Sequence, residues 1–172
     1  PRNDSADSVM IAVAMPKVQE TLEKLDKMDK KEVDFIKNLA NPDEKIKQIM
    51  FVIMHLFTNV DLDSKVQAAP NGKIDLTWPN AKKLINNPSK FVEDLKKYGR
   101  DEVRNNKVKY ENFVRAKKLI NEEELTVELL TKKSGAAAIF CDFALNIIEF
   151  AEVIRMVGPM EEELRELAIK LE

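Results

Sequence analysis

The chain has 172 residues, of which 44% are hydrophobic, and a formal net charge of −2, so it is long enough to bury one domain-sized core. Its charged fraction of 34%, with four glycines and 6% aromatic residues, predicts an all-α protein and argues against a β-sandwich or a disordered chain. The single cysteine excludes an internal disulfide framework, and the apolar run VMIAVAM is too short for a signal peptide or a membrane span, so we expect a soluble intracellular protein.

The first predicted element is a long amphipathic helix that reaches residue 40. Its apolar residues recur mostly at steps of three and four, with one break after Met28, and form a narrow stripe suited to pairing with another helix. Asn41 and Pro42 then suit the cap and the first turn of a new helix. The run IMFVIMHLF that follows is apolar almost all round, which predicts the central helix of a small core.

The middle of the chain has the turn and cap signals of several short helices. Residues 59–77 contain the turn sequence Pro-Asn-Gly and scattered aspartates, which is typical of a loop. Thr77 and Asn87, each followed closely by a proline, predict two helix starts, and Gly99 predicts where the second helix stops. Asn121, with a glutamate three residues later, resembles a capping box and predicts another start.

The last segment has the most regular pattern. Its apolar residues step alternately by four and three, which is the heptad seam of a coiled-coil strand. They are Ala136, Phe140, Phe143, Ile147, Phe150, Ile154 and Val157, followed by Met160, Leu164, Leu167 and Leu171 after a stammer at Gly158-Pro159. Two seams flank a compact middle, so we predict an antiparallel coiled-coil stalk capped by a helical head. Residues 1–40 would be the outgoing stalk helix, 41–135 the head, and 136–172 the last head helix continuing into the returning stalk helix.

Two prolines lie at similar sequence distances from the predicted head. Pro16 precedes Asn41 by 25 residues, and Pro159 follows Gly135 by 24 residues. At 1.5 Å per residue, both would be roughly 36 Å from the head. We therefore expect Pro16 and Pro159 to lie at the same height and to mark a shared kink or change of pairing in the stalk.

The charges are distributed unevenly between the two parts. Residues 41–135 hold 18 basic and 14 acidic side chains, a net charge of +4, whereas the flanks hold 10 and 16, a net charge of −6. A basic head on an acidic stalk would attract an acidic macromolecular surface, with an on-rate that falls as salt rises. A solvated helix face explains such lysine runs equally well. Nucleic acid is not the expected partner, because the chain carries no recognised nucleic-acid motif.

The chain offers little for catalysis. His55 in FVIMHLF and Cys141 in AIFCDFAL are expected to be packed core residues. One histidine and one cysteine cannot by themselves make a zinc site or a catalytic pair, and the four glycines form no phosphate-binding loop. We expect no catalysis, no metal and no cofactor in this chain.

Three stretches of the chain together resemble a known family over nearly the full length. They are AMPKVQETLEKL…VDFIKNLANPDEKIKQIMFVIMHLF, WPNAKKLINNPSKFVEDLKKYGRDEV and SGAAAIFCDFALNIIEFAEVIRMVGP. In this order and spacing they resemble the stalk and microtubule-binding domain of dynein heavy chains. The long loop before Trp78 is more similar to axonemal than to cytoplasmic members. The chain departs from the family at residues 99–102 and at Phe143, where the family has a tryptophan.

The resemblance implies a head of about six helices that docks between α- and β-tubulin by electrostatics. It also implies that sliding of the stalk helices relays the state of a distant ATPase ring in the parent motor, while this fragment is itself non-catalytic. We would then expect a monomer with an intramolecular coiled coil, no membrane contact, and a place in the cytoplasm and cytoskeleton, within the axoneme of a cilium or flagellum. From the residues alone, a coiled-coil-tipped adaptor that binds another acidic protein is the alternative.

The resemblance also assigns roles to single residues. The implied microtubule contacts are Lys45, Lys47, Arg104, Lys107, Lys109, Lys132 and Lys133. Glu128 lies one turn before Lys132, a spacing that favours an intrahelical ion pair of about 0.2–0.5 kcal/mol, and it would tune affinity by holding that lysine. An ordinary surface pair fits the same spacing. Pro16 and Pro159 would belong to the stalk hinge that changes register.

Overall fold

The computed structural model describes residues 4–171 apart from Asn106, and the side chains of residues 13–156 within that range. These described residues form helices and no β-strand, and none of their helices is both long and apolar enough to cross a membrane. The elements are α1 (Asp4–Lys27), α2 (Lys30–Lys37), α3 (Glu44–Phe57), α4 (Trp78–Leu84), α5 (Pro88–Lys97), the π-helical turn η1 (Tyr98–Glu102), α6 (Tyr110–Glu122), α7 (Val127–Thr131) and α8 (Gly135–Leu171).

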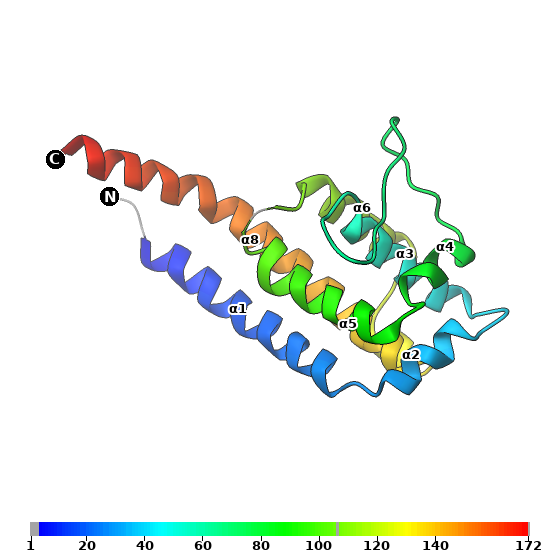
Figure 1. The fold of residues 1–172 in the computed structure, drawn as a ribbon. Helices are drawn as coiled ribbons and strands as arrows, with labels where there is room; N and C mark the ends of the chain where they lie inside the picture. Colours follow the sequence, from blue (N-terminus) through cyan, green and yellow to red (C-terminus); the bar gives the residue numbers. More distant parts are fainter. Residues whose placement is uncertain (1–3, 106, 172) are drawn as a thin grey trace.

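α1 and α8 form a stalk that leaves a head built from the other helices (Figure 1). Two ion pairs between these helices define their register: Lys17 Nζ lies 3.2 Å from Glu149 Oε1, and Lys24 Nζ lies 3.4 Å from Asp142 Oδ2. Seven residues forward along α1 thus correspond to seven residues backward along α8, which is an antiparallel pairing. The predicted all-α class, with an antiparallel helix pair capped by a helical bundle, is confirmed.

The heptad seam is buried over the part of α8 whose side chains are described. From α8 it contributes Ala136, Phe140, Phe143, Ile147 and Phe150, and from α1 it contributes Ala14, Val18 and Leu25. Ile154 is partly buried against the same core. The side chains from residue 157 onward, including the stammer at Gly158 and Pro159, lie outside the described part.

The register corrects the prediction about the two prolines. Pro16 lies inside α1, level with about residue 150 of α8. Pro159 lies nine residues further along α8, which is about 14 Å. The expected equal height is therefore wrong for this register. The reason is that α1 ends at Lys27, and α2 packs on α5 and α8 of the head, so residues 28–40 do not lengthen the stalk.

The centre of the head is α3, as its apolar sequence predicts. Residues 49–54, together with Leu56 and Phe57, are buried. A helix that is apolar all round can satisfy its side chains only when other helices surround it, and α3 packs against α4, α6 and α8. Its Phe57 ring lies 5.3 Å from the ring of Tyr98 and 6.1 Å from that of Phe91, which joins α3 to α5 and η1.

Buried polar side chains attach the long loop to this core. The carboxylate of Asp94, which is 3% exposed, accepts hydrogen bonds from the backbone N–H groups of Asp63 at 3.2 Å and Ser64 at 2.8 Å. Asn112 Nδ2 donates to the carbonyl oxygens of Leu56 at 3.1 Å and Thr58 at 2.8 Å. These bonds satisfy polar groups that would otherwise be costly to bury, and they hold the loop after α3 in one position.

Several predicted helix boundaries are confirmed. The break in the apolar stripe after Met28 lies where the first helix, predicted to reach residue 40, is in fact divided: α1 ends at Lys27 and α2 begins at Lys30. The Asp29 side chain caps α2 by accepting from the N–H of Lys31 at 2.9 Å. Thr77 caps α4 and Asn87 caps α5 in the same way. These caps are local, since each needs only a side-chain oxygen two or three residues before the N–H group that it accepts from.

Three predicted boundaries are wrong. Asn41 does not cap the helix after it, because α3 begins at Glu44 and its cap is Asp43. Gly99 does not stop a helix; the chain continues through η1, and a Cβ at this position would lie 3.1 Å from Ile147 Cδ1 and 3.3 Å from Leu22 Cδ2. Glycine is needed here because η1 packs closely against both stalk helices. Asn121 lies inside α6, and the cap of the next helix is instead Thr126, whose Oγ1 accepts from the N–H of Leu129 at 3.1 Å.

A larger residue at position 99 should loosen the junction of head and stalk. We expect Gly99→Val to lower the free energy of unfolding by about 1–3 kcal/mol, because its side chain would overlap Ile147, Leu22 and Phe143. Urea denaturation followed by circular dichroism measures this. Arg100→Val, at the exposed neighbouring position, is the matched control and should change stability by less than about 0.5 kcal/mol. Equal effects of the two changes would contradict the packing role of Gly99.

Candidate functional site

The start of α3 and the connection between α7 and α8 meet at the outer end of the head. Asp43 caps α3 by accepting from the N–H of Lys45 at 2.8 Å with one carboxylate oxygen. Its other oxygen accepts from Lys133 Nζ at 2.9 Å. The Lys133 ammonium, followed by the Lys45 N–H, lowers the pKa of the Asp43 carboxyl. One carboxylate therefore joins two segments that are 90 residues apart in the sequence.

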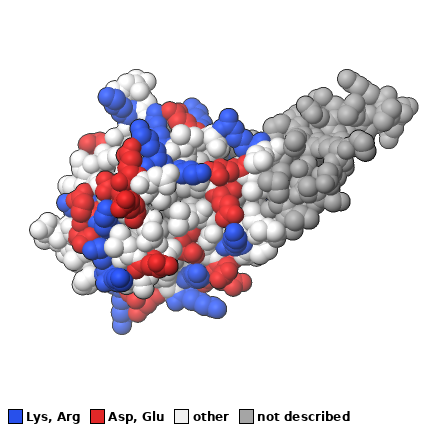
Figure 2. Space-filling view, turned by 180° about the vertical axis from the view of Figure 1, so that it is seen from behind, with Lys and Arg blue, Asp and Glu red and all other residues white. Residues whose placement is uncertain are grey.

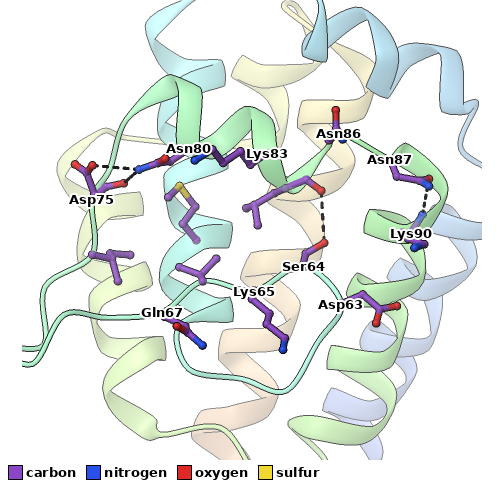
Figure 3. A pocket seen from close by; sticks show the side chains of 14 residues that line it. Asp63, Ser64, Lys65, Gln67, Asp75, Asn80, Lys83, Asn86, Asn87 and Lys90 are labelled. Carbon is purple, nitrogen blue, oxygen red and sulfur yellow. Dashed lines mark hydrogen bonds between the residues drawn. The ribbon is translucent and has the colours of Figure 1, made fainter.

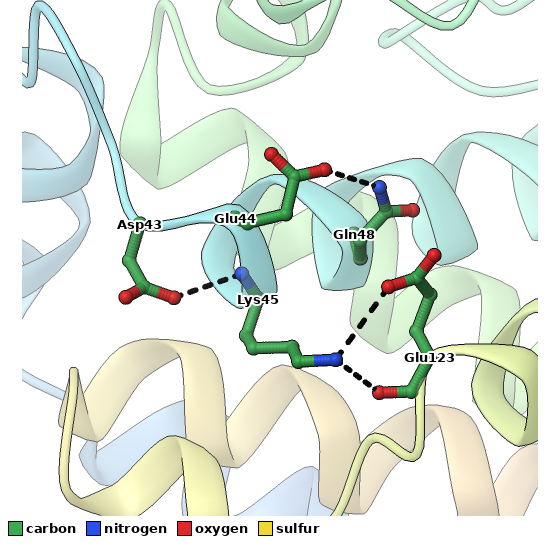
Figure 4. Close-up of polar contacts among 5 residues, drawn as sticks. All are labelled: Asp43, Glu44, Lys45, Gln48 and Glu123. Atoms are coloured by element: carbon green, nitrogen blue, oxygen red, sulfur yellow. Dashed lines mark hydrogen bonds and ion pairs between the residues drawn. The ribbon is translucent and has the colours of Figure 1, made fainter.

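The side chain of Lys45 extends from the first turn of α3 to Glu123 at the end of α6 (Figure 4). Its Nζ donates to the carbonyl oxygen of Glu123 at 2.5 Å and lies 3.5 Å from Glu123 Oε2. Lys47 Nζ lies 3.8 Å from Glu44 Oε2, and Glu44 also accepts from Gln48 Nε2 at 2.7 Å. Each of these lysines is thus half-buried and already adjacent to an acidic group.

Of the predicted contact residues, four are gathered at this outer end. We call Lys45, Lys47, Lys132 and Lys133 the outer lysines. Lys132 is exposed, and the structure shows no ion pair between it and Glu128 within the described residues. The other three are each 29–31% exposed and pair with Glu123, Glu44 and Asp43 respectively.

Arg104, Lys107 and Lys109 lie elsewhere, on the exposed segment that enters α6. The first residue of α6, Tyr110, has Arg155 of α8 stacked 3.7 Å over its ring, and Lys117 pairs with Glu152 at 2.7 Å. α8 begins at Gly135 at the outer end, so residue 155 is about 30 Å along its axis. The predicted basic contacts therefore form two groups, and the structure does not bring them together (Figure 1).

Sequence reasoning gave no role to a further basic group beside the outer lysines. Lys37 at the end of α2 donates to the carbonyl oxygen of Asn86 at 2.9 Å, and these residues line a hollow of about 490 Å³ with Lys82 and Lys83. Trp78 Nε1 donates to the carbonyl oxygen of Leu39 at 3.2 Å, which ties α4 to the linker that precedes α3. Lys82 and Lys83 are visible as a basic pair in the sequence WPNAKKL, but only the fold shows that their helix, α4, borders the outer end of the head.

The positive charge of the head is not a uniform patch. On the face shown in Figure 2, Lys and Arg lie interspersed with Asp and Glu. Lys96, for example, lies between Asp26 and Glu93, and its hydrogen bonds to these carboxylates raise the pKa of its ammonium. An approaching anionic surface would therefore meet cations that have acidic neighbours, which favours binding that depends on several contacts at once.

The described residues contain no group of three or more His, Cys, Asp or Glu side chains placed to hold a metal ion. His55 is partly buried, and desolvation, with a smaller contribution from the charge of Arg115, lowers the pKa of its imidazole. Cys141 is fully buried in α8 and is not paired. The outer end presents lysine ammonium groups, which can form charge-assisted hydrogen bonds with anionic groups.

Comparison with known proteins links this chain to one family. Residues 3–172 match the family described as "Microtubule-binding stalk of dynein motor". The chain is 31% identical over 150 residues to "Dynein heavy chain-like protein 2" of Plasmodium falciparum, covering 87% of the chain. It is 31% identical over 162 residues to "Dynein alpha chain, flagellar outer arm" of Chlamydomonas reinhardtii, and 27% identical over 164 residues to human "Dynein axonemal heavy chain 17", covering 94% of the chain in both cases. It spans about 3% of the length of each of these relatives.

The buried thiol gives a test of the core around α8. Burial, with a smaller contribution from the charge of Asp142, raises the pKa of Cys141 to about 12. At pH 8 roughly one thiol in ten thousand would then be the reactive thiolate, compared with about one in four at the usual pKa of a free thiol. We expect Cys141 to resist a thiol reagent in the native state and to react fully in urea, as followed by mass spectrometry. Native labelling as fast as that of a free thiol would contradict this burial.

Proposed function

The chain belongs to the microtubule-binding stalk family of dynein motors, as the non-catalytic stalk and not the ATPase ring, and from this we propose that its head docks on a microtubule through the outer lysines. The single observation that carries the proposal is the family match over almost the whole chain. The antiparallel α1–α8 pair supports it, because the start of α3 and the connection from α7 to α8, which carry the outer lysines, lie at the end of the molecule farthest from the free ends of the stalk (Figure 1).

We further propose that the parent protein is an axonemal dynein heavy chain acting in the cytoskeleton of a cilium or flagellum. The names of the flagellar and axonemal relatives support this location. In this proposal residues 41–135, with α2 packed beside them, form the docking head, and α1 and α8 form its stalk. The fragment is monomeric because its coiled coil pairs within one chain. Arg104, Lys107 and Lys109 would then be a separate contact on the stalk side of the head.

The outer lysines can dock by exchanging partners. Lys45, Lys47 and Lys133 are each held by a carboxylate of the head, so an acidic surface must compete with Glu123, Glu44 and Asp43 for them. Partly exposed pairs of this kind contribute little individually, about 0–1 kcal/mol. Several exchanged contacts are therefore needed for binding, and affinity should respond steeply to salt. Glu128, close to Lys132, would weaken docking as a further acidic group.

We also propose that the register of the stalk controls this docking. α1 is held to α8 by Lys17–Glu149 and Lys24–Asp142, whose charged groups are mostly well exposed, so a change of register costs little in ion pairing. Movement of α1 can reach the outer lysines because α2 and the linker to α3 follow it directly in the chain, and Asp43 at the end of that linker holds Lys133. Pro16 would ease the change, since it removes one hydrogen bond from α1.

Charge reversal at the outer lysines should weaken binding to microtubules. We expect Lys47→Glu and Lys132→Glu each to raise the dissociation constant about tenfold, equivalent to about 1.4 kcal/mol, without unfolding the head. Co-sedimentation with polymerised tubulin at several salt concentrations measures this, and thermal unfolding checks the fold. Lys118→Glu, at a position that is 74% exposed on α6, is the matched control and should change affinity less than twofold. Wild-type pelleting by both variants would remove the outer lysines from the docking surface.

Cross-linking the stalk in two different registers should give two different affinities for microtubules. In a Cys141→Ala background, Lys17→Cys with Glu149→Cys joined by a disulfide, whose reach is too short to span two registers, fixes the register of this structure. Lys17→Cys with Leu145→Cys fixes a register shifted by four residues, or about 6 Å. We expect the two cross-linked forms to differ at least fivefold in microtubule affinity, as measured by co-sedimentation. The same variants with the disulfide reduced are the controls, and identical affinities of the two locked forms would rule out control by register.

A further inference from the structure

A groove of about 730 Å³ lies between the long loop and the short helices α4 and α5 (Figure 3). Residues 63–67 and 74–75 of the loop form one wall, and α4 with the start of α5 forms the other. The buried side chains of Met54, Val66 and Leu84 contribute an apolar floor. The groove is therefore large enough for several residues of an extended chain, within the range of ordinary ligand sites.

The cations of this groove differ from the outer lysines. Lys65, Lys83 and Lys90, which we call the groove lysines, are exposed and line the groove (Figure 3). In the part of the chain that the structure describes, they form no ion pair, whereas Lys45, Lys47 and Lys133 each have a carboxylate partner. Two aspartates also line the groove, and Asp75 accepts from Asn80 Nδ2 at 3.2 Å. Three lysines against two aspartates leave the groove with a net charge of +1.

The polar side chains of the groove suit the backbone of a peptide. Gln67, Asn80, Asn86 and Asn87 line it, and an amide side chain carries both a donor and an acceptor. Asn87 uses its oxygen to cap α5, accepting from the N–H of Lys90 at 3.2 Å, so its amino group remains for a ligand. An extended peptide presents alternating N–H and C=O groups that such side chains can pair. A single small anion would use only a fraction of this volume and these groups.

The groove is preformed rather than assembled on binding. Asp94, buried under the loop, holds the N–H groups of Asp63 and Ser64, and Ser64 Oγ lies 3.5 Å from the carbonyl oxygen of Leu84 on the opposite wall. Asn59 Oδ1 accepts from the N–H of Ala68 at 3.1 Å and fixes the far end of the loop wall. A wall that is already ordered avoids part of the entropy cost of binding.

We propose that this groove binds an extended, carboxylate-rich peptide segment of the microtubule surface, beside the docking face. The inference rests on the proposed function for the source of the peptide, and on charge complementarity for its chemistry. Continuity supports the source: Lys83 lines both the groove and the hollow formed with Lys37 and Lys82, which borders the linker that leads to the outer lysines. A flexible acidic segment of a docked partner would therefore reach the groove without a second binding event.

The first experiment tests the chemistry of the ligand. A ten-residue Glu-rich peptide is titrated into the chain at low salt and followed by calorimetry and by amide chemical shifts. We expect shifts at Ser64, Asn80 and Lys83, and binding at least tenfold weaker for the variant Lys65→Gln, Lys83→Gln, Lys90→Gln. The matched control Lys27→Gln, Lys30→Gln, Lys118→Gln removes equal charge elsewhere and should bind within twofold of the wild type.

Three results of this titration would overturn the groove as a peptide site. They are equal binding by the groove variant and the control, chemical shifts confined to other surfaces, and displacement of the peptide by an equimolar amount of inorganic phosphate. A Gln-rich peptide of the same length should not bind, because it lacks the carboxylates.

The second experiment tests the source of the peptide. Co-sedimentation compares intact microtubules with microtubules whose exposed acidic tails have been removed by a protease. The groove variant should bind intact microtubules at least threefold more weakly than the wild type, and the two should bind trimmed microtubules equally. An equal loss on both kinds of microtubule, or no loss on either, would overturn the inference. Failure of the proposed function would look different, since the wild-type chain would then not pellet at all.

Discussion

One apolar face of α8 is buried along the helix, against the head near its start and against α1 further on. The rest of the molecule is arranged around this helix. Phe140 and Phe143 face the aromatic core, while Phe150 continues the same face into the stalk. Burial of such side chains contributes about 1.5–3 kcal/mol each, far more than any of the exposed ion pairs. Because the helix runs unbroken from Gly135 to Leu171, the packing of the head also fixes the direction in which the stalk leaves it.

Some lysines of the head pair with a carboxylate, and others have no ion-pair partner among the described residues. This difference says more about how the head could bind a partner than its net charge does. Lys45, Lys47 and Lys133 are held in place by acidic neighbours, so their positions are set before any partner arrives. Lys83 and Lys90 lie over a preformed groove with no ion-pair partner among the described residues. Lysines that are already paired favour selectivity, since a partner must compete with the carboxylate that holds each of them. Lysines without a partner favour rapid association with flexible acidic chains.

The sequence was sufficient for most features that depend on nearby residues or on a repeating pattern, although the local capping signals at Asn41 and Asn121 were wrong. The all-round apolar run predicted α3 as the centre, the heptad steps predicted the paired stalk, and the caps at Thr77 and Asn87 needed only local geometry. It failed where distant segments meet. Gly99 looked like a helix stop because its close packing against Leu22 and Ile147 is invisible in the sequence. The seven predicted contact residues likewise fell into two groups, since their separation follows from where α6 packs along α8.

The attachment of α6 to α8 has a mechanical consequence. Arg155 stacks on Tyr110 and Glu152 pairs with Lys117, so a head helix is fastened directly to the returning arm. Among the described side chains, α1 has no comparable stacking of an arginine on an aromatic ring. It contacts α5 through the ion pair of Asp26 with Lys96. If the register changes as proposed, α8 would stay with the head, to which these contacts attach it, and α1 would be the helix that moves along it. The load on the stalk and the change of register would then be carried by different helices, the load by α8 and the change of register by α1.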